Sequence, residues 1–123
     1  MILKKFYKTI SVLIIILILC FLPGNTANKM SVFYFPYFDK IVHFVMYFIF
    51  SFVLFVDLTN NTRLQKKQIF LIILLLSFII GGIIELIQNY FIPMRSGDWF
   101  DLLADLTGSL MFVFFSKYFI PFF

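Results

Sequence analysis

The chain has 123 residues, of which 63% are hydrophobic and 13% are charged. A soluble domain is closer to half apolar and a quarter charged, so this composition, with 20 Phe residues, excludes an ordinary water-soluble domain. The net charge of +4 comes from basic residues in short clusters between apolar runs, which favours topology signals and contact with anionic lipid over nucleic-acid binding, and the single cysteine excludes an intrachain disulfide.

Four apolar segments are long enough, or nearly so, to cross a membrane, which takes about 20 residues. The first is 6–22, and we expect it to remain as a span because its apolar core is longer than that of a cleaved signal. The others are 41–58, 69–92 and 99–120. The sequence therefore predicts an all-α fold: one domain over 1–123 that forms an integral membrane bundle of four transmembrane helices.

The predicted connections between these segments are short. The first, 23–36, carries aromatic residues at 33–35 that we expect at the membrane interface, where aromatic rings collect. The second, 59–68, is polar and basic. The third, 93–98, is so short that we expect the last two spans to form an antiparallel hairpin.

Basic residues are unequally divided between the two ends of this bundle. Because cytoplasmic loops carry an excess of Lys and Arg, we expect both termini and the second loop in the cytoplasm and the other loops outside. Seven basic residues fall at the end with the termini and three at the other: Lys4, Lys5, Lys8, Arg63, Lys66, Lys67 and Lys117 against Lys29, Lys40 and Arg95.

Polar residues gather at the outer ends of the spans. Asp39, His43 and Tyr47 follow i, i+4, i+8 spacing, so they share one helix face. The third span carries a similar stripe at Glu85 and Gln88, and the fourth begins with acidic residues. Because charged groups that face lipid are costly, we expect the stripes to face one another and to open to the outer water. The acidic residues of the fourth stripe are Asp98, Asp101 and Asp105.

Small residues support close packing of these helices. Ser77 and Gly81 form a small-xxx-small pair, and so do Ala104 and Gly108. Such pairs let helix backbones approach closely in lipid.

The first polar stripe resembles a known signature. Asp39-Lys40-x-x-His43-Phe44-x-x-Tyr47 resembles the D-K-x-x-H-F-x-x-Y motif of VanZ-like membrane proteins. A second block resembles that family's E-x-x-Q…R…D-x-x-x-N-x-x-G pattern, in the same order and on the same helices. It consists of Glu85, Gln88, Arg95, Asp101, Asp105 and Gly108.

The resemblance covers about 38–108 and implies a four-span protein in a bacterial cell envelope. The family is named for a protein linked to resistance to the glycopeptide teicoplanin, and it supplies no settled reaction. One position departs from the pattern, because Asp105 stands where the family often has Asn. Asp105 either adds a negative charge to the cluster or is protonated and donates a hydrogen bond.

Each member of the cluster has a structural and a functional interpretation. His43 is either a neutral imidazole that joins helices through Asp39 or Glu85, or a general base or metal ligand. Glu85 is a partner of Lys40 or Arg95, a carboxyl that burial keeps protonated, or a functional group, the usual role of an ionisable residue inside a membrane.

Arg95 either reaches to lipid phosphate or clamps a phosphate or carboxylate of a ligand, with Lys40 as a second charge. Asp98 is most simply the N-cap of the fourth helix, with Trp99 as interfacial anchor. Two carboxylates, Asp101 and Asp105, together with Glu85 and His43, form a candidate site for a divalent cation. The full candidate pocket is Asp39, Lys40, His43, Tyr47, Glu85, Gln88, Arg95, Asp101 and Asp105.

Three classes of function fit this pattern. The first is a membrane protein of the cell envelope whose pocket binds or modulates a lipid-linked wall precursor or an anionic lipid head group, with an effect on teicoplanin susceptibility. The second is a small hydrolase-like membrane enzyme that acts on a phosphate- or ester-containing lipid. The third is an oligomeric ion or proton transporter, which the apolar inner half of the bundle disfavours.

Overall fold

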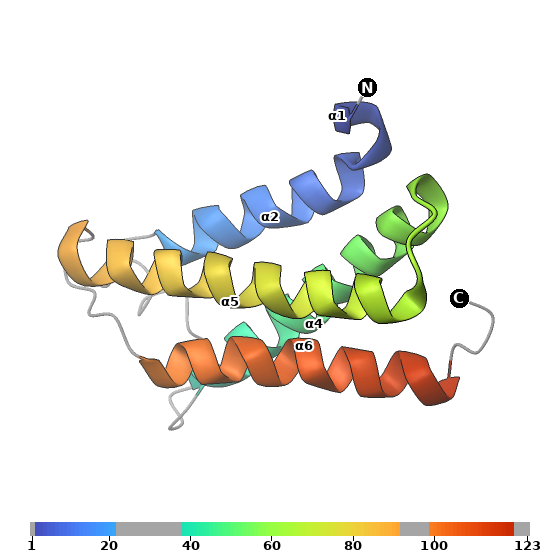
Figure 1. The fold of residues 1–123 in the computed structure, drawn as a ribbon. Coiled ribbons are helices and arrows are strands. Elements are labelled where there is room, and N and C mark those ends of the chain that lie inside the picture. Colours follow the sequence, from blue (N-terminus) through green and yellow to red (C-terminus); the bar gives the residue numbers. More distant parts are fainter. Residues whose placement is uncertain (1, 22–37, 92–98, 120–123) are drawn as a thin grey trace.

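The computed structural model describes residues 2–21, 38–91 and 99–119, which are helical apart from short breaks. Helices α4, α5 and α6 run side by side, and α2 packs mainly against α4 (Figure 1). The prediction of an all-α membrane bundle built on four apolar helices is confirmed. The helices are α1 (Ile2–Lys5), α2 (Tyr7–Cys20), α4 (Phe38–Asn61), α5 (Lys66–Phe91) and α6 (Trp99–Phe119).

Three helices, α4, α5 and α6, are long and apolar enough to cross a membrane. With 24, 26 and 21 residues, they measure roughly 36, 39 and 31 Å, which exceeds a hydrocarbon core of about 30 Å. The first predicted span is shorter than expected. Helix α2 has 14 residues, or about 21 Å, because the backbone leaves helical geometry at Phe6, and Leu22 lies outside the described residues.

The second predicted loop, 59–68, is also shorter than expected. Helix α4 continues to Asn61 and α5 begins at Lys66, so only residues 62–65 are non-helical. The Gln68 side chain caps the start of α5: its Oε1 atom accepts a hydrogen bond from the Gln65 N–H at 2.9 Å, as in a capping box. Polar and basic side chains therefore extend the helices beyond the apolar core instead of forming a longer loop. The predicted connections 23–36 and 93–98 lie outside the described residues.

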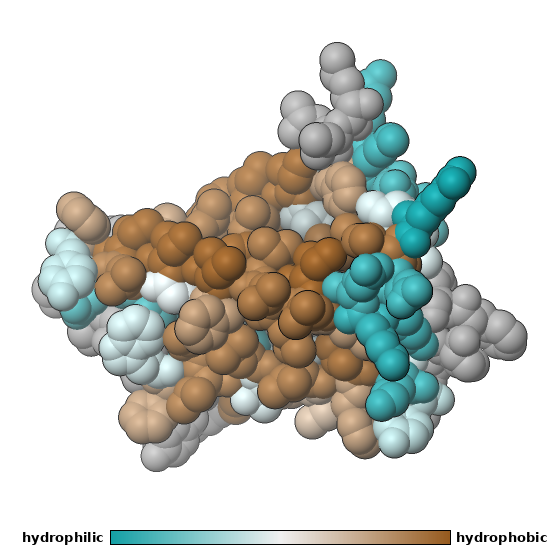
Figure 2. Space-filling model, viewed as in Figure 1, coloured by the Kyte–Doolittle hydropathy of each residue, from teal (hydrophilic) through white to brown (hydrophobic). Residues whose placement is uncertain are grey.

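The surface of the bundle divides into an apolar belt and a hydrophilic end (Figure 2). Along the belt, large apolar side chains such as Leu71, Phe78 and Ile83 are more than half exposed, which suits contact with lipid. The basic residues that we expect in the cytoplasm belong to α1, the first turn of α2, the α4–α5 connection, the start of α5 and the last turn of α6, which lie toward the same end of the bundle (Figure 1). We refer to this as the basic end and to the opposite one as the acidic end.

Helices α4 and α6 approach each other closely at Gly108. A Cβ atom at this position would collide with the main-chain oxygen of Phe44, so only glycine permits the approach. Phe112, one turn further along α6, is fully buried and its ring packs against those of Phe48, Phe52 and Phe55. This contact sets the distance between the polar residues of α4 and α6 at the acidic end.

Three buried serine hydroxyls join the spanning helices near their middle. Ser51 Oγ of α4 donates to Ser109 Oγ of α6 at 2.9 Å, and Ser77 Oγ of α5 lies 2.6 Å from the same atom. All three residues are fully buried. Hydrogen bonds of this kind hold helices together where lipid provides no hydrophobic drive between them.

A second polar contact anchors α2 at the basic end. Asp57 Oδ2 of α4 accepts hydrogen bonds from the backbone N–H of Thr9, at 3.1 Å, and from its hydroxyl, at 2.7 Å. One turn later Asn61 Nδ2 donates to the carbonyl of Lys5 at 2.8 Å. The carboxylate satisfies an N–H in the first turn of α2 that lacks a helical partner, and its charge favours that end of the helix dipole.

Candidate functional site

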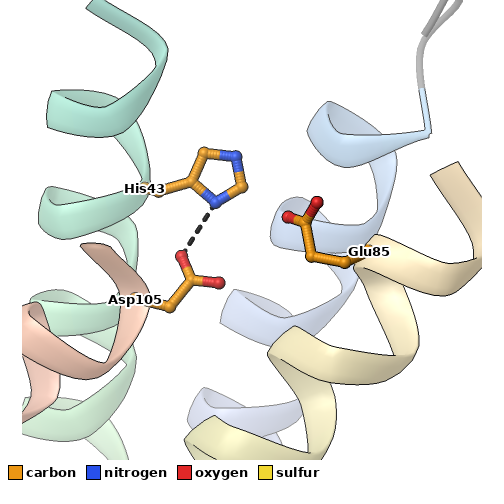
Figure 3. A group of neighbouring side chains, drawn as sticks. All are labelled: His43, Glu85 and Asp105. Atoms are coloured by element: carbon orange, nitrogen blue, oxygen red, sulfur yellow. Dashed lines mark hydrogen bonds and ion pairs between the residues drawn. The ribbon is translucent and has the colours of Figure 1, made fainter. Parts of the chain in front are cut away.

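Three helices place ionisable side chains in one buried space at the acidic end. His43 comes from α4, Glu85 from α5 and Asp105 from α6, and all three point toward one another (Figure 3). They are 3%, 2% and 1% exposed, and one nitrogen or oxygen atom from each lies within 4.8 Å of the others. Each residue is five to six positions from the outer end of its helix, or roughly 8–9 Å along the axis.

The imidazole of His43 lies between two carboxylates from successive turns of α6. Its Nδ1 atom is 2.8 Å from Asp105 Oδ1, and its Nε2 atom is 3.7 Å from Asp101 Oδ2. Lys40 Nζ is in turn 3.4 Å from Asp101 Oδ1. The i, i+4 spacing of the two aspartates places them on one helix face, and their contacts align Lys40, Asp101, His43 and Asp105 in a chain of charged groups.

The second oxygen of Asp105 lies on the side that faces Glu85 (Figure 3). This atom, Oδ2, has no hydrogen-bond partner among the described residues. A Cβ atom at Gly81 would come within 2.9 Å of it and within 2.7 Å of Leu102 Cδ1. Glycine at position 81 therefore makes the room in α5 that lets the Asp105 carboxylate enter the cluster.

A pocket of about 90 Å³ connects Glu85 with the surface of the bundle. Its other lining residues include Asn89, Tyr90 and Trp99, which are exposed, with Tyr90 72% and Trp99 58% accessible. The pocket lies between the end of α5 and the start of α6. It gives the buried carboxyl an approach from the depth where aromatic side chains meet lipid head groups.

One predicted pocket residue has other surroundings. Gln88 is buried, and its Nε2 atom donates to the carbonyl of Cys20 at 2.7 Å. That carbonyl belongs to the last residue of α2, so Gln88 ties α2 to α5. Tyr47 is 1% exposed and lies close enough to Asp105 and Glu85 to interact with their charges, and its hydroxyl has no hydrogen-bond partner among the described residues.

The remaining predicted residues are only partly described. Asp39 belongs to the first turn of α4, but its side chain is not among those described, and Arg95 and Asp98 lie outside the described residues. The structure therefore brings together five of the nine predicted pocket residues, with Tyr47 beside them: Lys40, His43, Glu85, Asp101 and Asp105.

Sequence reasoning missed the polar contacts elsewhere in the bundle. Asp57 was the one acidic residue that did not fit the outer cluster, and Asn61 follows it by one turn on the same helix face. That pair, at the end of α4 away from the polar stripe, was the available signal for a helix-joining contact. The serine contact had no such signal, because single serines are common in apolar spans.

The arrangement supports two kinds of chemistry. A histidine held by a carboxylate at 2.8 Å has its ring orientation fixed, as in general acid–base pairs. Carboxylates and an imidazole from three helices also form a donor set suited to a divalent cation. Comparisons with protein-family models, with curated proteins and with solved structures found no match.

Proposed function

We propose that this chain is a VanZ-like, multi-pass protein of a bacterial cytoplasmic membrane whose acidic end binds the head group of a lipid-linked ligand. The observation that supports this most directly is the buried cluster of His43, Glu85 and Asp105 beside a surface pocket edged by Tyr90 and Trp99. Ionisable groups inside a membrane are costly and mark functional sites. The pocket is small, so it accepts part of a head group and leaves acyl chains to the surrounding lipid.

The proposal includes an orientation, with both termini in the cytoplasm and the acidic end outside. It is supported by the basic end, which collects seven of the ten Lys and Arg residues. The test is cysteine labelling in intact cells, in a Cys20→Ser background, with Asn28→Cys, Ser96→Cys and Gln65→Cys. An impermeant maleimide should label the first two only; labelling of Gln65→Cys alone would reverse the orientation and end the proposal of an outward site.

The envelope function is tested by glycopeptide susceptibility. A teicoplanin-sensitive bacterium that expresses the wild type should tolerate more teicoplanin than one that expresses Glu85→Gln or His43→Ala at equal membrane levels. Asp57→Asn is the matched control, because it alters a buried carboxylate at the other end of the bundle. Equal susceptibility of all strains would remove the link to glycopeptides.

A lipid hydrolase is the second candidate, and the 2.8 Å contact between His43 and Asp105 is the observation that favours it. In this function His43 moves protons and Glu85 faces the bound head group. Lipid extracts of cells with wild type or Glu85→Gln should then differ in one substrate and its product. Transport is not proposed, because Phe55 and Phe112 form a buried aromatic contact one turn beyond the serine hydroxyls.

A further inference from the structure

We propose that His43, Glu85 and Asp105 bind one divalent cation inside the bundle. The three side chains come from three helices and offer an imidazole nitrogen and two carboxylate oxygens within 4.8 Å of one another. The site is defined by these atoms alone and does not depend on the identity of the lipid ligand.

A buried oxygen without a partner is the independent observation that points to a ligand. Asp105 is 1% exposed, and its Oδ2 atom has no hydrogen-bond partner among the described residues. This oxygen lies on the Glu85 side of the carboxylate (Figure 3). A buried polar atom without a partner is destabilising, and coordination of a cation satisfies it.

The ligand atoms of the three side chains need to move only a short way to bind one ion. Ligand atoms about 2.0–2.2 Å from one metal ion lie roughly 3–3.5 Å apart at tetrahedral or octahedral angles. The observed limit of 4.8 Å therefore closes through side-chain rotation, without movement of the helices. The tightest pair, His43 Nδ1 and Asp105 Oδ1, already lies at 2.8 Å.

The surroundings of His43 indicate which ring nitrogen is the ligand. Nδ1 faces Asp105, whereas Nε2 faces Asp101 Oδ2 at 3.7 Å, and Asp101 is paired with Lys40 at 3.4 Å. Metal-bound histidines donate their second N–H to a carboxylate, which fixes the ring and increases its basicity. Nδ1 therefore binds the ion, and Asp101 supports the ring from behind.

Charge also favours a dication. Glu85 and Asp105 carry two negative charges when ionised, and the neutral imidazole carries none. A divalent cation among them makes the group neutral overall, which lowers the cost of burial in a medium of low dielectric constant. Two carboxylates with one imidazole suit a cation such as Mn²⁺, which prefers oxygen and accepts nitrogen.

The pocket beside Glu85 is the entry path for the ion. It reaches from exposed Asn89 and Trp99 to the Glu85 side chain. Three protein ligands leave coordination positions for water or for a ligand oxygen. A head group in the pocket then approaches the cation from the Glu85 side.

The test is a Mn²⁺ titration of the full chain in nanodiscs of zwitterionic phosphatidylcholine, purified without a polyhistidine tag and stripped with EDTA. Free Mn²⁺ is measured by electron paramagnetic resonance. Wild type should bind one ion per chain. Glu85→Gln and Asp105→Asn keep the side-chain shapes, and each should weaken Mn²⁺ binding by more than the ~10–100-fold loss typical of a residue that only supports a ligand. Asp101→Asn should weaken Mn²⁺ binding by ~10–100-fold, because Asp101 contacts the His43 ring and not the ion.

Asp57→Asn is the control for loss of a buried carboxylate, and it should bind like the wild type. A wild-type chain without saturable Mn²⁺ binding overturns the proposal, and so does binding that survives both Glu85→Gln and Asp105→Asn. Pulsed electron paramagnetic resonance of the Mn²⁺-loaded wild type gives a check that does not depend on whether any variant folds. It should detect a directly bound imidazole nitrogen, because His43 is the one histidine of the chain, and bound Mn²⁺ without that signal also overturns the site.

Discussion

The two ends of the bundle bury carboxylates in different ways. At the basic end Asp57 Oδ2 accepts two hydrogen bonds from Thr9, one of them from the first turn of α2. At the acidic end His43 is shared between Asp101 and Asp105, Glu85 faces the same space, and Asp105 Oδ2 has no hydrogen-bond partner among the described residues. Burial of a carboxylate is therefore no sign of function by itself. The more useful criterion is whether hydrogen-bond donors around the carboxylate match its acceptor atoms.

The positions of the acidic residues in the sequence match these two environments. Asp57 is the one acidic residue of the described helices that lies outside the acidic end, and its carboxylate accepts hydrogen bonds from Thr9 of α2, so its role is to hold a helix. The acidic end collects carboxylates from two helices and a histidine from a third, more acceptors than a structural contact needs. The predictions below separate these roles, from the largest expected loss of stability to the smallest.

Gly108→Ala should disrupt the acidic end most strongly. Its Cβ atom would collide with the Phe44 main chain, and overpacking of this kind typically costs about 1–3 kcal/mol. Because the α4–α6 contact sets the distance between His43 and Asp105, Mn²⁺ binding should weaken as well. The measurement is the free energy of unfolding in mixed micelles on titration with SDS.

Gly82→Ala is the matched control on α5, since a Cβ atom there meets nothing within 4 Å. It should leave stability unchanged or raise it by about 0.5–1 kcal/mol through better helix propensity. Equal losses in the two variants would show that Gly108 has no special packing role.

Asp57→Ala should be the next largest effect, and it should affect stability only. The change leaves the Thr9 N–H and hydroxyl without their acceptor, a loss of about 1–3 kcal/mol. The same titration measures it, together with Thr9→Val and the double variant. A coupling energy near zero between Asp57→Ala and Thr9→Val would contradict the contact between these residues. Reduced Mn²⁺ affinity per folded chain in Asp57→Ala would show that the two ends of the bundle do not act separately.

Ser109→Ala should have a smaller effect, because it removes the hydroxyl that joins Ser51 and Ser77. Interhelical hydrogen bonds of membrane proteins contribute about 0.6 kcal/mol on average. We expect a loss of about 1 kcal/mol for the two contacts, against less for Ser116→Ala, whose hydroxyl bonds within its own helix. A larger loss in Ser116→Ala would argue against the serine contact between helices.

Glu85→Gln should have the smallest effect on stability and the largest on function. The variant keeps the shape of the side chain and removes a negative charge from a crowded, buried site, so the metal-free protein should be as stable as wild type or slightly more stable. Mn²⁺ should raise the thermal midpoint of wild type and leave that of Glu85→Gln unchanged. A marked loss of stability without metal would assign Glu85 a structural role like that of Asp57.

Much of this protein follows from its sequence alone. Apolar segments of spanning length predict the membrane bundle because lipid demands both an apolar surface and helical backbone hydrogen bonding. The stripes on three segments likewise predict that His43, Glu85, Asp101 and Asp105 meet, because each charged group in lipid needs polar neighbours. Helix ends were the weakest predictions, since polar residues at 59–61 and 66–68 remain helical where they reach the water beyond the apolar core.

Tertiary structure decided which polar neighbours each residue has. Helix periodicity gives the face of a side chain but not the helix that lies opposite, so Gln88 was assigned to the pocket although it bonds Cys20 of α2. The pairing of Asp57 with Thr9 joins residues 48 positions apart, and the Gly108 approach depends on the Phe44 main chain rather than on any side chain. The composition of a segment and its helical periodicity determine how deep in the membrane a side chain lies and on which face of its helix. Which helix lies opposite that face depends on how all the helices pack together.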